Sequence, residues 1–365
     1  MRAVVLREVG RPAAVEELTL RPVAEHEVLV QVAASGVCHT DLSVRDGGMP
    51  ALLPCTLGHE GAGIVTEVGA GVTTVRPGDH VVLTWNVPCR TCPDCLRGDS
   101  HLCPSGLGHA FGEPYAVSAD GAVWPSMGAG TLAEQTLVPA AAVVPVDPSL
   151  PLDIAALLGC AVTTGVGAVM RTAAVRPGQS VLVIGCGGVG LAAMQGARLA
   201  GAARIIAADT VAAQLSTAKA NGATDTIDAS EVDPVTAVRE LTGGAGVDHG
   251  IEVVGKPAAI RAAYDATRRG GTVTVVGAAA LDESVTFPAL SLMADGKTTR
   301  GSVYGGSDPA RDIPLLAELA LRGRLDLEAL VTRRIDIDGV EAAFAEMALG
   351  HGARSVVIAA GGTGR

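Results

Sequence analysis

Short apolar stretches interrupted by proline and glycine fill the first 161 residues of the chain. Residues 28–32, 63–68, 80–83 and 141–146 are four of these stretches, and their length is typical of β-strands. The proline and glycine residues between them mark turns. This pattern predicts an irregular, mainly β domain over residues 1–161.

The pattern changes after residue 178, where apolar strand candidates begin to alternate with helix candidates. Alternating strands and helices are typical of an α/β fold with a parallel, doubly wound sheet. We therefore predict a second domain of this type over residues 162–303. Its expected elements include strands at 180–184, 204–208 and 273–276 and helices at 188–200 and 211–221.

The remaining segment, residues 304–365, carries two amphipathic helix candidates and one apolar strand candidate. The helix candidates are residues 312–322 and 339–348, and the strand candidate is residues 355–360. We expect this segment to return to the first domain and complete it.

Length and charge limit the class of protein. A chain of 365 residues with 48% hydrophobic residues can fill two separate cores. A formal net charge of −11 and a pI near 5.2 argue against nucleic acid or an anionic membrane as the main partner, because both would repel the surface. The longest apolar segment, residues 181–194, contains four glycines and is too short to span a bilayer. Residues 1–10 do not resemble a secretory signal, so we expect a cytoplasmic protein.

Four cysteines lie close together in the first domain: Cys89, Cys92, Cys95 and Cys103, with two, two and seven residues between them. This spacing suits one tetrahedral zinc site with four thiolate ligands. Two disulfides are the alternative interpretation, but disulfides form in oxidising compartments, and the start of the chain does not resemble a secretory signal. The sequence therefore predicts a lobe held by structural zinc over residues 86–104.

A Gly-x-Gly-x-x-Gly pattern occurs where the strand expected at 180–184 meets the next helix. In a Rossmann domain, the first glycine permits a tight turn and the second lets the backbone approach a pyrophosphate. The third glycine allows the helix to pack on the sheet. A glycine-rich turn without a ligand is the alternative interpretation. The predicted dinucleotide-binding residues of this loop are Gly185, Gly187, Gly188, Val189 and Gly190.

Asp209 follows Gly190 by 19 residues, at the end of the next strand candidate. There its carboxylate would accept hydrogen bonds from the adenosine ribose hydroxyls. Its negative charge would repel a 2′-phosphate, so we expect NAD as the cofactor rather than NADP. The alternative for Asp209 is a simple capping residue.

Two more polar interruptions in apolar surroundings lie around Cys38 and His59. On its own, a cysteine beside a histidine in a loop is more often structural than a metal ligand. However, residues 36–41 and 58–61, the four-cysteine lobe, residues 158–160 and the glycine-rich loop occur in an order that resembles the zinc-dependent medium-chain alcohol dehydrogenases. The resemblance spans essentially the whole chain and implies a GroES-like fold for the first domain.

The resemblance implies that Cys38, His59 and Cys160 bind a catalytic zinc ion and leave a fourth position for water or substrate. Asp41 would then orient His59, and Glu60 would lie behind the metal. The alternative for both carboxylates is that they are solvated loop residues. The implied cofactors are two zinc ions, one catalytic and one structural, and NAD.

Further roles follow from the resemblance by position. Thr40 would take the proton of the alcohol hydroxyl group. Ser43 stands where many relatives carry a histidine that ends the proton relay. The resemblance therefore does not identify the residue that passes the proton on to solvent. Trp85 would line the substrate pocket and favour substrates with an unsaturated or aromatic group. The alternative for Trp85 is a core residue. The implied contacts to the cofactor are His39 and Arg354 at the pyrophosphate, with a surface role as the alternative for His39, and Thr164 at the nicotinamide amide.

The predicted function is a zinc- and NAD-dependent alcohol dehydrogenase that interconverts primary alcohols, preferably aromatic or allylic, and aldehydes. One alternative is oxidation of a thiol adduct of formaldehyde. Residues 104–107 lie where glutathione-dependent relatives carry an arginine, which disfavours glutathione and leaves mycothiol as the thiol. A second alternative is a zinc-stabilised nucleotide-binding protein without catalysis, which the presence of the reactive metal ligands disfavours.

The resemblance also implies a homo-oligomer, since most members of the family are dimers or tetramers joined through their nucleotide-binding sheets. The long connection between residues 103 and 131 favours a dimer over a tetramer. The expected partner is a small-molecule alcohol or aldehyde, with no nucleic acid and no membrane.

Overall fold

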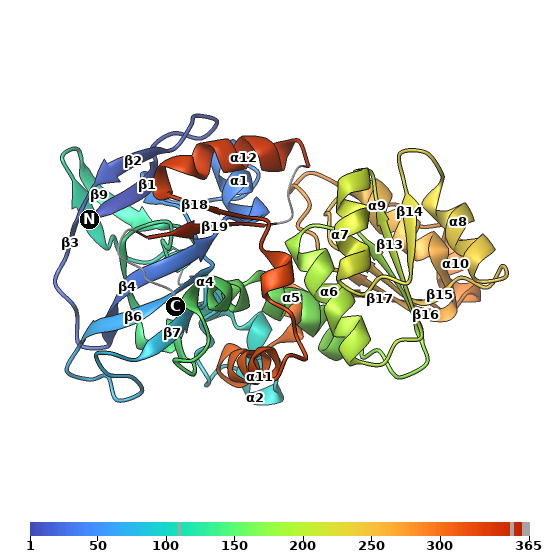
Figure 1. Ribbon diagram of the computed structural model, residues 1–365, viewed down its shortest axis with the longest axis horizontal. Helices are drawn as coiled ribbons and strands as arrows, with labels where there is room; N and C mark the ends of the chain where they lie inside the picture. Colours follow the sequence, from blue (N-terminus) through green and yellow to red (C-terminus); the bar gives the residue numbers. More distant parts are fainter. Residues whose placement is uncertain (109–110, 351–353, 360–365) are drawn as a thin grey trace. The chain divides into compact units, whose positions relative to one another are not determined.

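The computed structural model describes residues 1–108, 111–350 and 354–359 (Figure 1). The chain divides into two compact units. The first unit consists of Met1–Thr163 and Asp308–Arg365, and the second is Thr164–Ser307. The sequence placed the two boundaries after residues 161 and 303.

The strands of the first unit form two sheets. One sheet has six strands: β1 (Arg2–Leu6), β2 (Ala14–Glu17), β3 (Thr19–Leu20), β5 (Cys55–Thr56), β8 (Ala116–Ser118) and β9 (Gly121–Pro125). The other has seven: β4 (Glu27–Gly36), β6 (Gly61–Val68), β7 (His80–Leu83), β10 (Gln135–Pro139), β11 (Val143–Pro145), β18 (Arg333–Ile335) and β19 (Ser355–Ile358). The spatial orders are β2-β1-β5-β9-β8-β3 and β11-β7-β6-β4-β19-β18, with β10 also paired to β4.

Strand β4 shows how the sequence pattern produces this unit. Val28, Val30 and Val32 alternate with less buried residues and are at most 2% exposed. Side chains alternate between the faces of a strand, so these valines share the face that packs into the core. Antiparallel β6 borders β4 on one side and antiparallel β19 on the other. Residues 355–358 therefore complete a sheet that begins near the start of the chain.

Helices of the first unit cover these sheets or connect them. Phe344, which is 0% exposed, packs from the last of these helices into a cluster with Leu6, Val37 and Leu57. The helices are α1 (His39–Asp46), α2 (Pro93–Arg97), α3 (Pro104–Gly108), α4 (Leu152–Ala155), α11 (Pro309–Leu321) and α12 (Val340–Ala348), and α5 (Ala161–Gly167) crosses into the second unit.

The second unit is a six-stranded sheet in which all neighbouring strands are parallel. Its strands are β12 (Ser180–Ile184), β13 (Arg204–Asp209), β14 (Asp225–Asp228), β15 (Val247–Glu252), β16 (Thr267–Val275) and β17 (Thr298–Gly301). Its helices are α6 (Gly188–Leu199), α7 (Ala212–Ala220), α8 (Pro234–Leu241), α9 (Pro257–Ala266) and α10 (Ala289–Ala294). The order β14-β13-β12-β15-β16-β17 is that of a doubly wound dinucleotide-binding fold, which confirms the predicted fold class.

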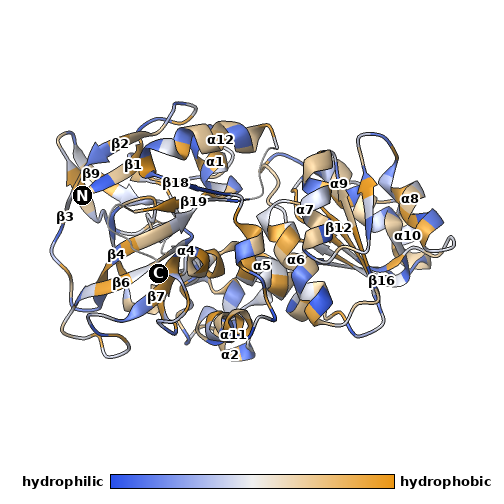
Figure 2. Ribbon diagram, viewed as in Figure 1, coloured by the Kyte–Doolittle hydropathy of each residue, from blue (hydrophilic) through white to orange (hydrophobic). Residues whose placement is uncertain are grey.

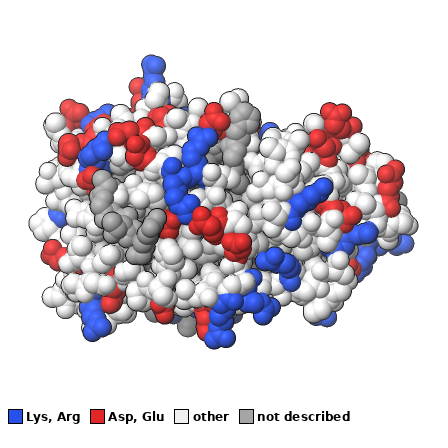
Figure 3. All heavy atoms as spheres, in the orientation of Figure 1, with Lys and Arg blue, Asp and Glu red and all other residues white. Residues whose placement is uncertain are grey.

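Polar and apolar residues are mixed on the outer helices of the second unit. Outer helices such as α8 carry both kinds of residue (Figure 2), with Val238 buried and Glu240 exposed. Basic and acidic side chains are interspersed on the face seen in Figure 3. Within the described residues, no single helix has the length and apolar character needed to cross a membrane. One bent pair, Leu152–Gly159 with Ala161–Thr172, meets that test by length and composition only.

Candidate metal centres and nucleotide site

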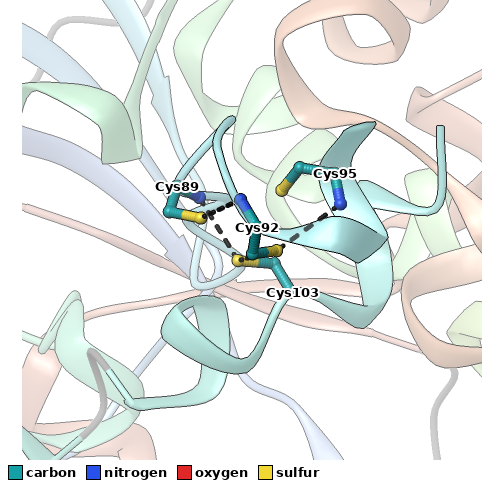
Figure 4. Close-up of side chains that lie close together, drawn as sticks. All are labelled: Cys89, Cys92, Cys95 and Cys103. Atoms are coloured by element: carbon teal, nitrogen blue, oxygen red, sulfur yellow. Dashed lines mark hydrogen bonds between the residues drawn. The ribbon is translucent and has the colours of Figure 1, made fainter. Parts of the chain in front are cut away.

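The four lobe cysteines converge around α2 (Figure 4), and their Sγ atoms all lie within 4.8 Å of one another. Backbone N–H groups point at the sulfur atoms. Cys92 N–H donates to Cys89 Sγ at 3.3 Å, and Cys95 N–H donates to Cys92 Sγ at 3.5 Å. Each of the eight cysteines lies within the described residues and is a free thiol. The disulfide alternative for the lobe therefore has no support in the structure.

The geometry of the lobe fits a tetrahedral zinc ion. Zinc–sulfur bonds of about 2.3 Å place two thiolates of a tetrahedral site about 3.8 Å apart. The Sγ atoms of Cys92 and Cys103 are 3.8 Å apart. A hydrogen bond from Thr91 is the main cause that lowers the pKa of Cys89 to about 5, which favours the thiolate that zinc binds.

Asp308, the N-cap residue of α11, connects this helix to the lobe through its carboxylate. Arg90 has a left-handed backbone φ of +66°, and its guanidinium binds both carboxylate oxygens of Asp308, with Nη2 2.9 Å from Oδ1. The hydroxyl group of Ser100 donates to Oδ2 of the same carboxylate at 2.8 Å. Burial alone would raise the pKa of Asp308, but the hydrogen bonds from Arg90 and Ser100 outweigh it and lower this pKa to about 2.

We expect Asp308→Asn to loosen the lobe, because the charged partner of Arg90 is lost. Zinc should leave the lobe for a chelator several-fold faster at neutral pH, as followed with a chromogenic zinc indicator. A carboxylate with a lowered pKa contributes its full stability above about pH 4, and loses it as the pH falls toward about 2. The difference in unfolding temperature between the variant and the wild type should therefore shrink below about pH 4.

Asp94→Asn is the matched control for this experiment. Asp94 also pairs with an arginine of the lobe, Arg97, but that arginine is 61% exposed and lies only one helical turn away. Exposed pairs of this kind contribute about 0–1 kcal/mol. Equal rates of zinc release from the two variants would contradict the assigned role of Asp308.

Three side chains from distant parts of the first unit form a second group. Cys38 caps α1, His59 precedes β6, and Cys160 precedes α5. Their ligand atoms all lie within 4.8 Å of one another, and the residues are 6%, 0% and 8% exposed. The structure thus brings together the three residues that the resemblance implied as zinc ligands.

The free ring nitrogen of His59 is the strongest sign that this group fits a metal ion. Nε2 is buried and has no hydrogen-bond partner among the described residues. The other ring nitrogen, Nδ1, lies 3.1 Å from Oδ1 of Asp41. Buried polar atoms are rarely left without a partner, and a bound ion would supply one. Two thiols and an imidazole are zinc ligands that leave a fourth position open.

The ligands also shift one another's pKa values. The hydrogen bond from Cys160 is the main cause that lowers the pKa of Cys38 well below its usual range, and the charge of His59 acts in the same direction. Burial would lower the pKa of His59, but the charges of Asp41 and Cys38 raise it well above its usual value. The group therefore favours a thiolate at Cys38.

Asp41 orients His59 and is a buried residue, which excludes the alternative of a solvated loop carboxylate. Its Oδ1 atom also accepts a hydrogen bond of 2.9 Å from Gly58 N–H. Its Oδ2 atom accepts one of 3.3 Å from Cys38 N–H. A single carboxylate thus joins the loops that carry two of the three ligands.

Glu60 is also fully buried and connects all three ligand segments. Its Oε1 atom accepts from Ala161 N–H at 2.9 Å, next to Cys160. Its Oε2 atom lies 2.6 Å from Nη1 of Arg354, which donates to Val37 O at 3.2 Å. Burial raises the pKa of Glu60 to about 7, although the charge of Arg354 opposes this rise.

The pairing of Arg354 with Glu60 was not anticipated from the sequence. Arg354 is 5% exposed and lies in the first unit beside the ligand loops. No spacing signal connects two residues that are 294 positions apart. The pyrophosphate contact expected for Arg354 stays a prediction.

The other candidate residues of the first unit lie on α1 and just after β7. Thr40 and Ser43 are half-buried on α1, three positions apart, and His39 is exposed at the start of that helix. Trp85 is half-buried just after β7. In the second unit, Thr164 is 9% exposed on α5.

The glycine-rich loop joins β12 to α6 in the second unit. Gly185 has a φ of +100°, a conformation that favours glycine. A Cβ atom on Gly190 would lie 1.9 Å from Gly185 O, so no larger residue fits there. Around Gly187, in contrast, no atom of the described residues other than its own chain neighbours lies within 4 Å of the Cβ position. The loop is closed on the sheet side and open where a phosphate would approach the start of α6.

Asp209 ends β13 beside this loop. Its Oδ2 atom accepts a hydrogen bond of 2.7 Å from Cys186 N–H, and its Oδ1 atom accepts one of 2.9 Å from Val211 N–H. The carboxylate therefore fixes the loop, and its expected contact to the ribose stays a prediction.

Two protein-family models match the chain. Residues 24–148 match the alcohol dehydrogenase GroES-like domain, and residues 188–321 match the zinc-binding dehydrogenase family. The first match covers most of the β sheets of the first unit. The second begins at the end of the glycine-rich loop, at Gly188, and covers five strands of the parallel sheet, β13 to β17.

Similar proteins cover almost the whole chain. An S-(hydroxymethyl)glutathione dehydrogenase from a Synechocystis strain is 39% identical over 98% of this chain and 99% of its own length. The crystal structure of an alcohol dehydrogenase zinc-binding domain protein from Burkholderia ambifaria has a TM-score of 0.92 and 39% identity, and covers 98% of each chain. Benzyl alcohol dehydrogenase from Acinetobacter calcoaceticus has a TM-score of 0.91 and 34% identity, over 98% of this chain and 99% of its own.

Proposed function

Because the chain belongs to the zinc-dependent medium-chain alcohol dehydrogenases, we propose that it oxidises primary alcohols, preferably aromatic or allylic, to aldehydes. As a member of this family it is an oxidoreductase that uses zinc and a nicotinamide nucleotide. The proposed reaction site is the group of Cys38, His59 and Cys160. The observation that carries the proposal is the buried Nε2 atom of His59, which has no hydrogen-bond partner in the described part of the chain and belongs to the same group as two thiols.

Each metal group would have its own task. Cys38, His59 and Cys160 would hold the catalytic zinc ion, while the lobe cysteines would hold the structural one. When bound, the catalytic zinc supplies a Lewis acid that lowers the pKa of a hydroxyl group, and the nicotinamide supplies the hydride acceptor. Asp41 holds the imidazole of His59 through Nδ1, so that Nε2 faces the thiols.

We propose that Thr40 accepts the proton of the alcohol hydroxyl group. A hydroxyl group can accept one proton while it donates another, which a relay requires. Thr40 lies two positions after Cys38, in the first turn of α1. Ser43 follows three positions later and therefore lies on the same face of the helix. The pair offers a route for the proton along α1 without a histidine at position 43.

The cofactor proposed for the second unit is NAD. Its pyrophosphate would lie over the glycine-rich loop and the start of α6. The carboxylate of Asp209 stands at the end of β13, where a 2′-phosphate would meet a like charge. His39, Thr164 and Arg354 are proposed as further contacts to the cofactor.

Asp209→Asn tests this assignment, because it removes the charge and keeps one of the two oxygens that accept hydrogen bonds from the loop. We expect the ratio of kcat/KM for NAD to that for NADP to fall about tenfold. Asp228→Asn is the matched control, since Asp228 ends the neighbouring strand β14 and its oxygen binds Ser230. An unchanged ratio in Asp209→Asn would contradict the selection of NAD by charge.

Two observations bear on the substrate. Trp85, half-buried just after β7, would provide a flat apolar wall for an aromatic body. The similar structure named benzyl alcohol dehydrogenase supports the same substrate class.

The second candidate substrate is a thiol adduct of formaldehyde, because curated proteins 38–39% identical to this chain are named S-(hydroxymethyl)glutathione dehydrogenase. Residues 104–108 carry no basic side chain for a glutathione carboxylate, so mycothiol is retained as a second thiol.

A substrate panel distinguishes these candidates. NADH formation is measured with benzylic, allylic and short aliphatic alcohols, and with formaldehyde plus glutathione or plus mycothiol. The highest kcat/KM is expected for a benzylic or allylic alcohol. Rapid oxidation of a thiol adduct with inert benzylic alcohols would replace the first proposal by the second. No turnover with any of them would favour a nucleotide-binding protein without catalysis.

We also propose that the protein is a homodimer joined through the second unit. Strand β17 ends the parallel sheet, and all four of its residues are exposed. Leu281, Leu290 and Met293 nearby in the sequence are 92%, 70% and 73% exposed. An exposed strand edge with apolar neighbours is typical of an interface. Light scattering should give twice the chain mass of 36.5 kDa, and Met293→Asp should lower it.

A cytoplasmic location is proposed for a chemical reason. Both metal groups need free thiols, and reducing compartments keep thiols from forming disulfides. Fractionation of cells followed by immunodetection tests this proposal.

A further inference from the structure

Glu252 is a buried carboxylate that the proposed reaction does not use. It is the last residue of β15 and is 0% exposed. Its Oε1 atom accepts hydrogen bonds of 2.6 Å from the backbone N–H groups of both Val254 and Gly255. Its Oε2 atom is buried without a hydrogen-bond partner among the described residues. Burying a carboxylate costs free energy unless hydrogen bonds compensate, and satisfied buried hydrogen bonds rigidify the backbone that donates them.

The backbone that Glu252 holds lies against the glycine-rich loop. A Cβ atom on Gly185 would lie 2.7 Å from Cγ2 of Val254 and 3.0 Å from Cγ2 of Val253. A Cβ atom on Gly190 would lie 3.3 Å from Cγ2 of Val253. Two glycines of the dinucleotide motif are thus packed on the segment that follows Glu252. Residues 253–254 therefore border the phosphate loop on the side of β15.

A third loop closes the arrangement. A Cβ atom on Gly277 would lie 2.0 Å from Gly255 N. Gly255 has a φ of +81°, and its own Cβ position is 2.5 Å from Ala278 O. The backbone oxygen of Glu252 accepts from Val276 N–H at 2.8 Å. The loops after β12, β15 and β16 therefore interlock, and Glu252 lies at their junction.

The strand order indicates which part of the cofactor these loops would meet. In a doubly wound sheet, a dinucleotide lies across the carboxyl ends of the strands at the point where the order reverses, here between β12 and β15. Asp209 ends β13 and marks the adenosine side. The other half of the cofactor would then lie over the ends of β15 and β16. Val254, which is 42% exposed, presents an apolar side chain there.

We propose that Glu252 is a positioning residue of the dinucleotide site, which holds residues 253–255 in the shape that receives the nicotinamide half of the cofactor. This inference rests on the proposed nucleotide-dependent function and deepens it. Glu252 acts through the backbone of Val254 and Gly255 and does not need to touch the ligand. Binding of the adenosine half, which lies on the other side of the point where the strand order reverses, should depend little on Glu252.

Glu252→Leu and Glu252→Gln test the proposal by calorimetric binding of NADH and of AMP, which carries only the adenosine half. Leucine removes the acceptor of two backbone N–H groups, so the Kd for NADH should rise about tenfold, with AMP within about threefold of wild type. Glutamine keeps a carbonyl oxygen for both N–H groups, so both Kd values should stay within about threefold of wild type. Glu240→Leu, at an exposed acid of the same unit, is the matched control.

The possible failures can be told apart. Gly277→Ala pushes on Gly255 without changing Glu252, and it should give the same selective loss of NADH binding even if Glu252→Leu does not fold. Equal losses of NADH and AMP binding in folded Glu252→Leu or Gly277→Ala protein would overturn the positioning role. Wild-type NADH binding by both Glu252→Leu and Gly277→Ala would overturn it as well. A wild-type protein that binds neither ligand would instead contradict the proposed function itself.

Discussion

Cys38→Ser is expected to reduce the zinc content from two ions per chain to one and to lower kcat/KM for the alcohol by about 10³-fold. The serine hydroxyl is a much poorer zinc ligand than a thiolate, and Cys38 is the thiol whose pKa the group lowers. Losing the Lewis acid removes several kcal/mol of charge stabilisation in the transition state. Elemental analysis of zinc and initial rates of NADH formation measure the two effects.

Cys55→Ser is the matched control for this prediction. Cys55 is also fully buried in the first unit, but it belongs to neither group of potential metal ligands. The control should keep two zinc ions per chain and its activity. A Cys38→Ser protein that retained both ions and turned over the alcohol normally would remove the basis for the assigned reaction site.

Arg354→Met should lower the free energy of unfolding by about 3 kcal/mol, because it leaves a buried carboxylate without its charged partner. Nη1 of Arg354 and Oε2 of Glu60 are 2.6 Å apart, and their side chains are 5% and 0% exposed. Methionine fills much of the same space, so the loss of stability would be due to the missing charge rather than to a cavity. Thermal and denaturant unfolding measure the change.

A second variant separates the charge effect from simple loss of packing. Glu60→Gln combined with Arg354→Met should recover part of the stability, since a neutral amide needs no counter-charge and still accepts from Ala161 N–H. Arg322→Met is the surface control. Its pair with Glu318 is 71% and 57% exposed, and loss of such a pair changes stability by about 0.5 kcal/mol or less. Equal effects at positions 354 and 322 would contradict the importance of the buried pair.

The local elements were largely predictable because their signals are local. The expected strand at 180–184 is β12, and the helix expected at 188–200 is α6 (Gly188–Leu199). Errors occur where pairing extends or shortens an element. β16 already begins at Thr267, since that residue pairs with Val247 across an irregular register. β11 begins only at Val143, because Ala140–Ala142 forms a 3₁₀ turn.

The reaction site was only partly predictable. Cys38, His59 and Cys160 are separated by long stretches of chain, so spacing alone cannot bring them together, and the resemblance to a family was needed. The resemblance did not anticipate the ion pair between Glu60 and Arg354. Such a pair depends on how the last strand docks on β4, which is a property of the folded sheet rather than of any short pattern.

The position of β19 has a consequence for biosynthesis. This strand pairs with β4 near the ligand Cys38, yet it is translated after the entire nucleotide-binding unit. On the ribosome, the parallel sheet can therefore fold early, whereas the reaction centre waits for residues 354–358 to leave the exit tunnel. A nascent chain arrested before them would contain the whole parallel sheet but would lack the arginine that pairs with Glu60.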